Sequence, residues 1–383
     1  MLTERDIAYI REQIAPHAAP VLSLYVDVNP AKPENANRAW LVRAKNALRE
    51  LSLPAELSRN VLELLEQERP SARTLVLFAA EDVLERYDLQ VDLPVVDLAH
   101  GRVEARWGEP YVAPLVYALD EFERAGALCL HRSGWRFFEI NLGGIEEITD
   151  LFAEVAQDEW GELEAYIPVL RDNLLRARAT SRADRFAQRM QAWVYRFFKR
   201  LASIVERVVV QRDIRRLVLL GPEEETKFFE QFLSRDLRRR VVAHVGALPA
   251  PDASPSQVLE RVAPALEAAE RAEEQALLDK IRDLPGIWGI DPTLDALQMG
   301  QLSVLVAPWN LDVKVWRCPD GWVAETKERA RLMCVDGEPE KVSLHDIIVD
   351  LAMDFGTRLE FVRGEAEERL RREFHGLAGL RRW

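Results

Sequence analysis

The sequence has little cysteine and lacks any long apolar run. Its three cysteines, Cys129, Cys318 and Cys334, are an odd number scattered over 383 residues. Such a set argues against a secreted disulfide framework and predicts reduced thiols. No stretch approaches the roughly 18 to 20 apolar residues that span a bilayer, and the opening residues MLTERDIAYIREQ are charged from the fourth onward. We therefore expect a cytoplasmic protein that does not use a membrane.

The motifs of common metal and nucleotide sites are also missing. The six histidines are isolated, and none has a spacing such as His-Glu-x-x-His. The segment GPEEETKF follows an expected strand, but it lacks the Gly-Lys-Ser/Thr ending of a phosphate loop. Cys318 and Cys334 stand in twin Cys-x-Asp-Gly contexts, which are weak candidates for zinc because Asp-Gly turns explain them more simply. The sequence therefore predicts no cofactor and no metal.

Acidic residues dominate the composition, with a formal net charge of -13, but the charge is not spread evenly. Between Arg171 and Arg216 the chain carries thirteen lysines and arginines against four acidic residues. A local basic field in an acidic body is typical of a surface that binds a polyanion.

Apolar periodicity predicts alternating strands and helices. VLSLYVDV and TLVLFA are typical of strands, ALCLHRSGWRFFEI of a hairpin, and RRLVLLG, EEETKFFEQFL and RRRVVAHV of a strand, a helix and a strand. This alternation indicates an α/β fold with a mostly parallel sheet in the middle of the chain. Proline-containing boundaries divide the chain into three consecutive α/β domains, 1–110, 111–248 and 249–383.

The segment RARATSRADRFAQRMQAW opens the longest expected helix. Ser181 and Asp184 have the spacing of a capping box, which predicts a helix from Ser181 to about Val209. At 100° per residue the apolar positions form one core-facing stripe. Its members are Phe186, Met190, Trp193, Phe197, Leu201, Ile204 and Val208. Six arginines follow one flank of this stripe: Arg182, Arg185, Arg189, Arg196, Arg200 and Arg207.

Two interpretations of these arginines remain open. The simpler one is a solvated helix face whose charges are paired with acids elsewhere. Acidic partners at i+4 are mostly absent, however, and the basic line continues upstream to the helix start, where backbone N–H groups also suit phosphate. We therefore predict a surface that binds a polyanion such as a nucleic acid, formed by Arg176, Arg178, Arg182, Arg185, Arg189 and Arg196.

The segment TSRADRFAQRM resembles the middle domain of the archaeo-eukaryotic class I release factors and their relative Pelota. In the release factors a Gly-Gly-Gln loop leads into a helix reading Ser-Ala-Leu-Arg-Phe-Ala-Arg, and Arg185-Phe186-Ala187 match its core. VLSLYVDVNP is similar to the first strand of the N-terminal domain, and GIDPTLDALQMGQLSVLVA to part of the C-terminal domain. The bacterial branch, the baeRF families, is the most similar. This resemblance implies three domains arranged as in a class I release factor or Pelota.

The catalytic loop of that family is replaced in this chain. Alignment on Arg185 and Phe186 places Ala179-Thr180-Ser181 where the release factors carry Gly-Gly-Gln. The Cβ atoms of alanine and threonine disfavour positive φ, and serine lacks the amide that positions water. The pair Gly143-Gly144 belongs to an expected hairpin end and does not restore the motif. We therefore expect Ser181 to cap the helix and predict no catalytic residue.

The stop-codon-reading loop is replaced as well. In the release factors an Asn-Ile-Lys-Ser loop precedes an Asn-Arg pair. Matching that pair to Asn37 and Arg38 leaves Ala31-Lys32-Pro33-Glu34 in its place. The equivalents of the decoding loop are therefore Lys32, Glu34, Asn37 and Arg38. Family members often hold zinc with Cys-x-x-Cys pairs in the C-terminal domain, and here only Cys318 and Cys334 correspond to them.

The resemblance implies a non-catalytic factor that binds the ribosomal A site in ribosome hibernation or rescue. Its partners would be ribosomal RNA, peptidyl-tRNA or the tRNA acceptor end, together with a translational GTPase such as EF-Tu; DNA is not expected. Two alternatives stay open. One is a peptidyl-tRNA or RNA hydrolase that uses another residue near Ser181, and the other is an interaction scaffold unrelated to ribosomes.

Overall fold

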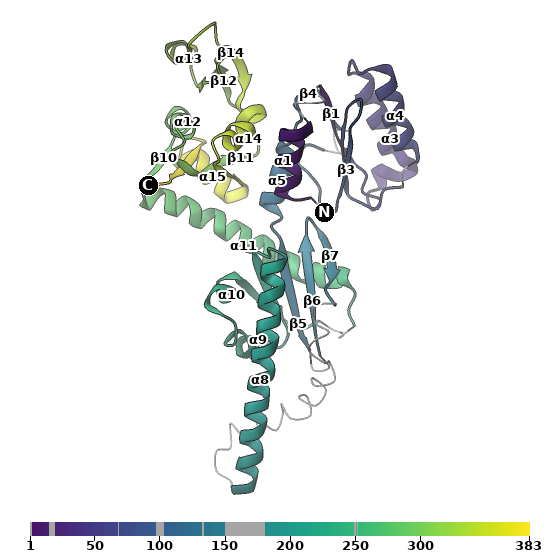
Figure 1. The fold of residues 1–383 in the computed structure, drawn as a ribbon, viewed down its shortest axis with the longest axis vertical. Coiled ribbons are helices and arrows are strands. Elements are labelled where there is room, and N and C mark those ends of the chain that lie inside the picture. Colours follow the sequence, from purple (N-terminus) through teal and green to yellow (C-terminus); the bar gives the residue numbers. More distant parts are fainter. Residues whose placement is uncertain are drawn as a thin grey trace. The chain divides into compact units, whose positions relative to one another are not determined.

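The computed structural model describes residues 2–14, 20–67, 69–96, 103–131, 134–149, 181–248, 250 and 252–383 (Figure 1). Contacts divide the chain into two compact units. The first unit combines Met1–Phe122 with Arg271–Trp383, and the second is Glu123–Glu270. Strands and helices alternate in both, which confirms the predicted α/β fold class. The three domain boundaries drawn from the sequence stay a prediction.

The first part of the first unit is built on an antiparallel sheet. Its strands lie in the order β3-β2-β1-β4. Their bounds are β1 Val21–Asp27, β2 Thr74–Ala79, β3 Leu84–Leu89 and β4 Glu104–Gly108. The helices around it are α1 Glu4–Tyr9, η1 Ile10–Ile14, η2 Pro33–Arg38, α3 Ala39–Arg49, α4 Ala55–Gln67 and α5 Ala113–Glu121.

Strand β1 is buried along its whole length, because both faces of its sheet are covered. On one face, Leu24 and Val26 belong to one core with Trp40 of α3 and Val61 of α4. On the other face the ring of Tyr25 packs edge-on against neighbouring aromatic rings. The strand therefore fixes where the chain leaves the sheet after Asp27.

The second part of the first unit has a mixed sheet with strand order β10-β16-β11-β15 and a smaller sheet with order β13-β12-β14. The strands are β10 Gly286–Trp288, β11 Leu302–Pro308, β12 Lys314–Arg317, β13 Val323–Ala324, β14 Glu340–Ser343, β15 Arg358–Val362 and β16 Ala378–Arg381. The helices are α12 Ile290–Gln298, α13 Lys327–Met333, α14 Leu344–Asp354 and α15 Gly364–Glu373. Leu370 and Phe374, from α15 and its end, pack with Val306 and Val362 in the core of the larger sheet.

The second unit contains a sheet with strand order β7-β6-β5-β8-β9. The strands are β5 Ala125–His131, β6 Gly134–Asn141, β7 Gly144–Glu147, β8 Arg216–Leu220 and β9 Val241–Val245. Strand β8 runs parallel to β5 and β9, whereas β6 is antiparallel to β5 and β7. The expected parallel pairing is therefore found for β5–β8 and β8–β9, whereas the hairpin strand β6 is antiparallel to both of its neighbours.

Long helices contribute to the cores on the two faces of this sheet. Helix α8 (Ser181–Gln211) shares a core with Leu128 and Leu217, and α11 (Pro255–Asp283) contributes Val258 to a core with Ala127 and Val218 (Figure 1). Successive strand residues alternate between these cores, as a pleated strand requires. Two shorter helices, α9 (Glu223–Glu230) and α10 (Arg235–Arg240), lie between β8 and β9 in the sequence. The observed start and end of α8 agree with the predicted helix to within two residues.

Among the residues that the structure describes, no helix combines the length and the apolar character needed to cross a membrane.

Candidate nucleic-acid interface

Helix α8 presents one apolar side to the sheet of the second unit. Leu201, Ile204 and Val208, which the sequence predicted to lie on the core-facing stripe, are fully buried or nearly so. Phe198 and Val205 join them in the same core. Burying one side of a long amphipathic helix in this way fixes its rotation about its own axis and leaves the opposite side to solvent.

The solvent side of α8 is basic in the part whose side chains are described. Arg196, Lys199, Arg200 and Arg207 are all exposed. At 100° per residue the three arginines fall within an arc of about 40°. This places the cations on one narrow line, as the sequence predicted, along a helix whose other side is held by the core.

The remaining predicted RNA-binding arginines are covered only in part by the structure. Arg182, Arg185 and Arg189 belong to the continuous helix α8, but their side chains lie outside the described part, and Arg176 and Arg178 lie outside the described residues altogether. The segment that replaces the catalytic loop is also described only in part: Ala179 and Thr180 lie outside the described residues, whereas Ser181 is the first residue of α8. The role of the five arginines in binding RNA stays a prediction.

The cations beyond the end of α8 have structural partners. Arg212 pairs with Glu139 at 3.1 Å, and Arg124 approaches the same carboxylate at 3.4 Å. Arg216 is almost completely buried and pairs with Glu270 of α11. The basic window counted in the sequence therefore contains an exposed line on α8 and, after the helix, cations whose ion pairs lie within the second unit.

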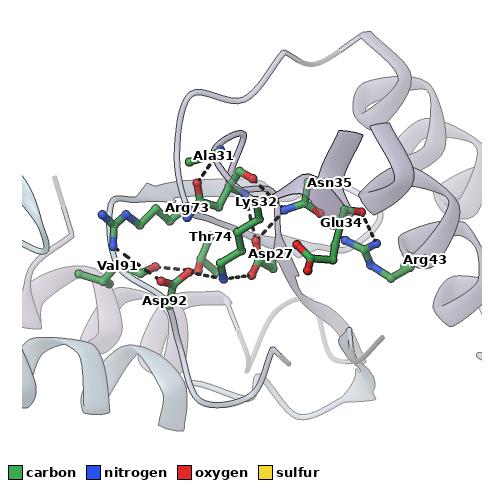
Figure 2. A network of polar contacts seen from close by, with 11 residues as sticks. Asp27, Ala31, Lys32, Glu34, Asn35, Arg43, Arg73, Thr74, Val91 and Asp92 are labelled. Atoms are coloured by element: carbon green, nitrogen blue, oxygen red, sulfur yellow. Dashed lines mark hydrogen bonds and ion pairs between the residues drawn. The ribbon is translucent and has the colours of Figure 1, made fainter. Parts of the chain in front are cut away.

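The segment equivalent to the decoding loop is held by a buried carboxylate at the end of β1 (Figure 2). Asp27 is 1% exposed, and one of its oxygens accepts hydrogen bonds from the Asn29 backbone N–H at 3.0 Å and from Asn35 Nδ2 at 2.9 Å. The other oxygen accepts from Lys32 Nζ at 2.5 Å. Three donors from the following loop thus converge on one side chain. Asn35 is itself held by Arg43, which donates to its Oδ1.

Lys32 is the centre of an ion-pair network rather than an isolated surface cation. Its Nζ also donates to Asp92 at 2.9 Å, so two carboxylates flank one ammonium group (Figure 2). Burial alone lowers the pKa of Lys32, but the hydrogen bonds and negative charges of Asp27 and Asp92 outweigh it and raise that pKa above its ordinary value. Lys32 therefore stays protonated, and its positive charge is balanced by two carboxylates of the fold.

The Asn37-Arg38 pair turns the chain into helix α3. Both residues have positive φ, 54° and 62°, a conformation that asparagine tolerates better than most residues. The Arg38 guanidinium donates to the carbonyl oxygens of Leu65 and Glu66 at 2.8 and 2.7 Å, near the end of α4. Glu34 is exposed, and its carbonyl oxygen accepts from Arg43 at 3.2 Å. Of the four decoding-loop equivalents, Lys32 and Arg38 thus have structural contacts through their side chains.

The Gly143-Gly144 pair lies in the turn between β6 and β7. Asn141 pairs with Gly144 across this turn, and Gly143 has a φ of 72° that favours glycine. Both glycines therefore serve the hairpin, in agreement with the sequence analysis, and they do not form a catalytic loop.

Cys318 and Cys334 form a disulfide, so the prediction of reduced thiols was wrong for this pair. Cys318 follows β12 and Cys334 follows α13, and the small sheet brings their Cα atoms to 5.4 Å, within the range that a disulfide bridges. Sequence spacing did not reveal this approach. As bonded sulfurs they are not thiolate ligands, which removes the weak metal candidacy. Cys129 is free and buried, and burial raises the pKa of its thiol to about 12, which makes it unreactive at neutral pH.

We predict that reducing this disulfide destabilises the small sheet by about 3 kcal/mol, the loop-closure value for a bridge of this sequence separation. Hydrogen exchange of residues 314–343 should quicken with reductant. The Cys318→Ser, Cys334→Ser double variant is the control and should exchange at the fast rate whether or not reductant is present. Rapid alkylation of both cysteines in the untreated native protein would contradict the assignment of the bridge.

A comparison with protein families matches residues 110–267, less than half of the chain, to bacterial archaeo-eukaryotic release factor family 10. The matched segment contains the sheet of the second unit and the whole of α8. No curated protein matches the chain.

Several solved structures of translation factors are also similar to this chain. The archaeal translation termination factor aRF1 is 16% identical with a TM-score of 0.26, and the match covers 100% of this chain and 99% of aRF1. Archaeal Pelota, from a model of the ribosome-bound protein with ABCE1, is 12% identical with a TM-score of 0.41, covering 100% and 94%. S. cerevisiae Dom34, described as interacting with Hbs1, is 9% identical with a TM-score of 0.40, covering 81% and 79%.

Because each of these TM-scores is below 0.5, no functional conclusion rests on the structural likenesses. The family match includes TSRADRFAQRM, one of the three motifs of the resemblance, whereas the N-terminal and C-terminal motifs lie outside the matched residues. Residues 110–267 of this chain are therefore similar to family 10 of the bacterial archaeo-eukaryotic release factors.

Proposed function

We propose that this chain binds the bacterial ribosome at the A site and cleaves no bond there. The observation that carries the proposal is the basic line on α8, which lies within the segment that matches a release factor family. Exposed arginines on one line of a rigid helix suit the regularly spaced phosphates of RNA, since phosphate contacts supply most of the affinity of such interfaces.

The absence of hydrolysis follows from the residues that replace the family's catalytic loop. Ala179-Thr180-Ser181 provide neither the two glycines nor the glutamine of Gly-Gly-Gln. Ser181 begins α8, where a serine hydroxyl ordinarily satisfies the free N–H groups of the first turn. A serine nucleophile would need a positioned base, and neither a histidine nor a lysine is near it in sequence.

The N-terminal loop supports the same proposal, because its chemistry does not suit codon reading. The Lys32 ammonium lies between the carboxylates of Asp27 and Asp92, and Arg38 binds backbone carbonyls. Neither side chain is left to recognise a base in this arrangement. The N-terminal domain would thus occupy the decoding centre without recognising the bases of a codon.

The partners that we propose are ribosomal RNA or the tRNA acceptor end at α8, and a translational GTPase such as EF-Tu at the C-terminal domain. The proposal follows an analogy with two other proteins: archaeal Pelota, described with ABCE1 on the ribosome, and Dom34, described as interacting with Hbs1. The process that we propose is ribosome hibernation or rescue, both of which use an A-site factor that does not read a stop codon.

We predict that the purified protein co-sediments with vacant ribosomes and that the Arg182→Glu, Arg185→Glu, Arg189→Glu triple variant does not. Each phosphate contact on duplex-like RNA adds roughly 0.9 to the slope of log affinity against log salt. Loss of three such contacts should therefore reduce the slope by roughly 2 to 3 and weaken binding by at least about tenfold. Co-sedimentation over a salt series, with and without EF-Tu, measures both quantities.

The matched control is the Arg182→Lys, Arg185→Lys, Arg189→Lys variant, which keeps the charge and should retain most of the binding. If all three proteins bind equally, the arginines form a solvated face and the scaffold alternative gains support. Turnover of a model peptidyl-tRNA ester that disappears in Ser181→Ala would instead favour the hydrolase alternative.

A further inference from the structure

Five aromatic rings form a cluster in the second unit: Tyr195, Phe198, Phe228, Phe229 and Phe232. Phe198 of α8 stacks on Phe232, with ring centres 5.5 Å apart and an interplanar angle of 27°. Tyr195 of α8 meets Phe232 edge-on at 5.1 Å, and Phe228 of α9 meets Phe198 edge-on at 5.7 Å. The cluster therefore joins two helices that are separate in the sequence.

The outer two rings of this cluster are unusually open to solvent. Tyr195 is 58% exposed and Phe228 is 43% exposed, whereas Phe198 is 4% exposed and belongs to the hydrophobic core. Single exposed aromatic residues are common on protein surfaces. Two exposed rings that both pack against Phe232, which itself packs against the core, are a different arrangement, since their orientation is set before any ligand arrives, which lowers the entropy lost on binding.

Cations border the exposed rings on the α8 side. Lys199 is exposed one helical turn after Tyr195, and at 100° per residue it falls between Tyr195 and Arg196 on the helix surface. The acidic residues of α9 next to Phe228 are partly engaged: Glu223 pairs with Lys227 at 2.6 Å, and Glu230 pairs with His244 at 3.1 Å. The aromatic surface thus continues from α8 to α9, whereas cations border it on the α8 side and α9 begins with Glu223, Glu224 and Glu225.

We propose that Tyr195 and Phe228 form a stacking site for unpaired bases of an RNA strand whose phosphates lie along the basic side of α8. Proteins bind single-stranded nucleic acid by this combination of aromatic faces and neighbouring positive charge. The inference extends the proposed function and rests on it for the source of the RNA. In this arrangement α8 binds the phosphate backbone of the RNA, and the aromatic cluster holds flipped or single-stranded bases.

A protein partner is the other ligand that an aromatic surface suits, because tyrosine and phenylalanine are common at protein interfaces. The charge pattern favours RNA. Lys199 lies one helical turn after Tyr195 on the same side of α8, whereas the centres of protein interfaces are depleted in charged residues and particularly in lysine. The two ligands also differ in a measurable way, since only RNA binding should distinguish a single strand from a duplex.

The test uses the full chain and a short single-stranded oligoadenylate that carries one 2-aminopurine, whose fluorescence falls when the base stacks. The wild-type protein should quench this fluorescence and bind the single strand more tightly than a duplex of the same length. The Tyr195→Ala, Phe228→Ala double variant should lose the quenching and bind at least about tenfold more weakly, the order of effect expected for one or two stacked bases.

Two variants keep this result interpretable. Tyr195→Phe retains the ring and should bind as the wild type does, and Trp383→Ala removes an aromatic side chain that is 80% exposed outside the cluster and should change nothing. Circular dichroism of every variant confirms that the chain is folded. Equal quenching and affinity for wild type and double variant would overturn the proposal, as would a wild-type protein that binds no single strand at all.

Ribosome co-sedimentation of the same proteins separates this inference from the proposed function. If the arginine variant loses the ribosome while the aromatic variant keeps its quenching, the proposed function stands and the stacking site is wrong. If the wild type fails to sediment with ribosomes but its quenching depends on Tyr195 and Phe228, the stacking site stands and the ribosomal assignment is wrong. Loss of ribosome binding in the aromatic variant without any effect on the oligonucleotide would indicate a protein contact and would overturn the stacking site.

Discussion

Arg216→Ala is expected to lower the free energy of unfolding of the second unit by about 3 to 5 kcal/mol. Arg216 lies on β8, an interior strand of the sheet, and is 5% exposed. Its guanidinium pairs with Glu270 of α11, which is 2% exposed, and approaches Glu123 at 3.3 Å. Truncation leaves the Glu270 carboxylate buried without its counter-charge, and this desolvation penalty is larger than the net gain that the intact pair provides. Denaturant unfolding followed by circular dichroism measures the loss.

The double variant Arg216→Met, Glu270→Leu tests the cause of that loss. It removes both charges and fills the space with apolar side chains, so it should recover most of the stability lost in Arg216→Ala. Arg215→Ala is the surface control, because Arg215 is exposed and should change stability by less than about 0.5 kcal/mol. If Arg216→Ala unfolded at the same denaturant midpoint as Arg215→Ala, the buried ion pair would contribute little to the stability of the second unit.

The elements of this fold could be predicted well where local sequence determines them. TLVLFA corresponds to β2 residue for residue, because a short run of β-branched and apolar side chains has few alternatives to a buried strand. The start of α8 at Ser181 also agrees with the prediction, since the apolar stripe continues without a helix-breaking residue. Both signals are contained within the segment that they describe.

The features that could not be predicted depend on contacts between distant residues. The antiparallel part of the second sheet comes from the hairpin β5–β6 and its extension into β7, and strand patterns alone do not give the direction of pairing. The bridge between Cys318 and Cys334 depends on how α13 returns to β12. Spacing alone cannot report that two cysteines sixteen residues apart come within bonding distance.

In the candidate site, too, features set by local sequence were predictable and contacts between distant residues were not. The exposed cations of α8 were predictable from helical periodicity, whereas the pairing of Arg212 with Glu139 joins residues 73 positions apart. The aromatic cluster was missed because Tyr195 and Phe228 belong to different helices, although Phe228, Phe229 and Phe232 in one short helical segment gave a signal that could have been followed. Charge counts along a sequence include cations that form ion pairs within the fold together with cations on the exposed side of α8.

Asp27 organises the loop after β1, and the comparison with the decoding loop of the release factors does not identify this residue. Asp27 ends a strand, and Asn29 and Asn35 follow at positions typical of turns closed by side chains. Within the loop, Asn29 Oδ1 accepts from the backbone N–H of Ala31 at 3.0 Å, and Asn35 Nδ2 also donates to the carbonyl oxygen of Asn29 at 3.0 Å. The loop is therefore ordered from within, and Asp27 connects this internal order to the sheet.

Asp27→Ala is expected to lower the free energy of unfolding of the first unit by about 3 kcal/mol, because it removes an acceptor from buried donors of Asn29 and Asn35 as well as from Lys32. The matched control is Asp92→Ala. Asp92 binds the same lysine, but it is 43% exposed, so its removal should change stability by less than about 1 kcal/mol. Denaturant unfolding compares the two variants, and hydrogen exchange of residues 28–38 should quicken strongly in Asp27→Ala alone. Equal effects of the two substitutions would mean that the Lys32 ion pairs, rather than the buried carboxylate, hold this loop in place.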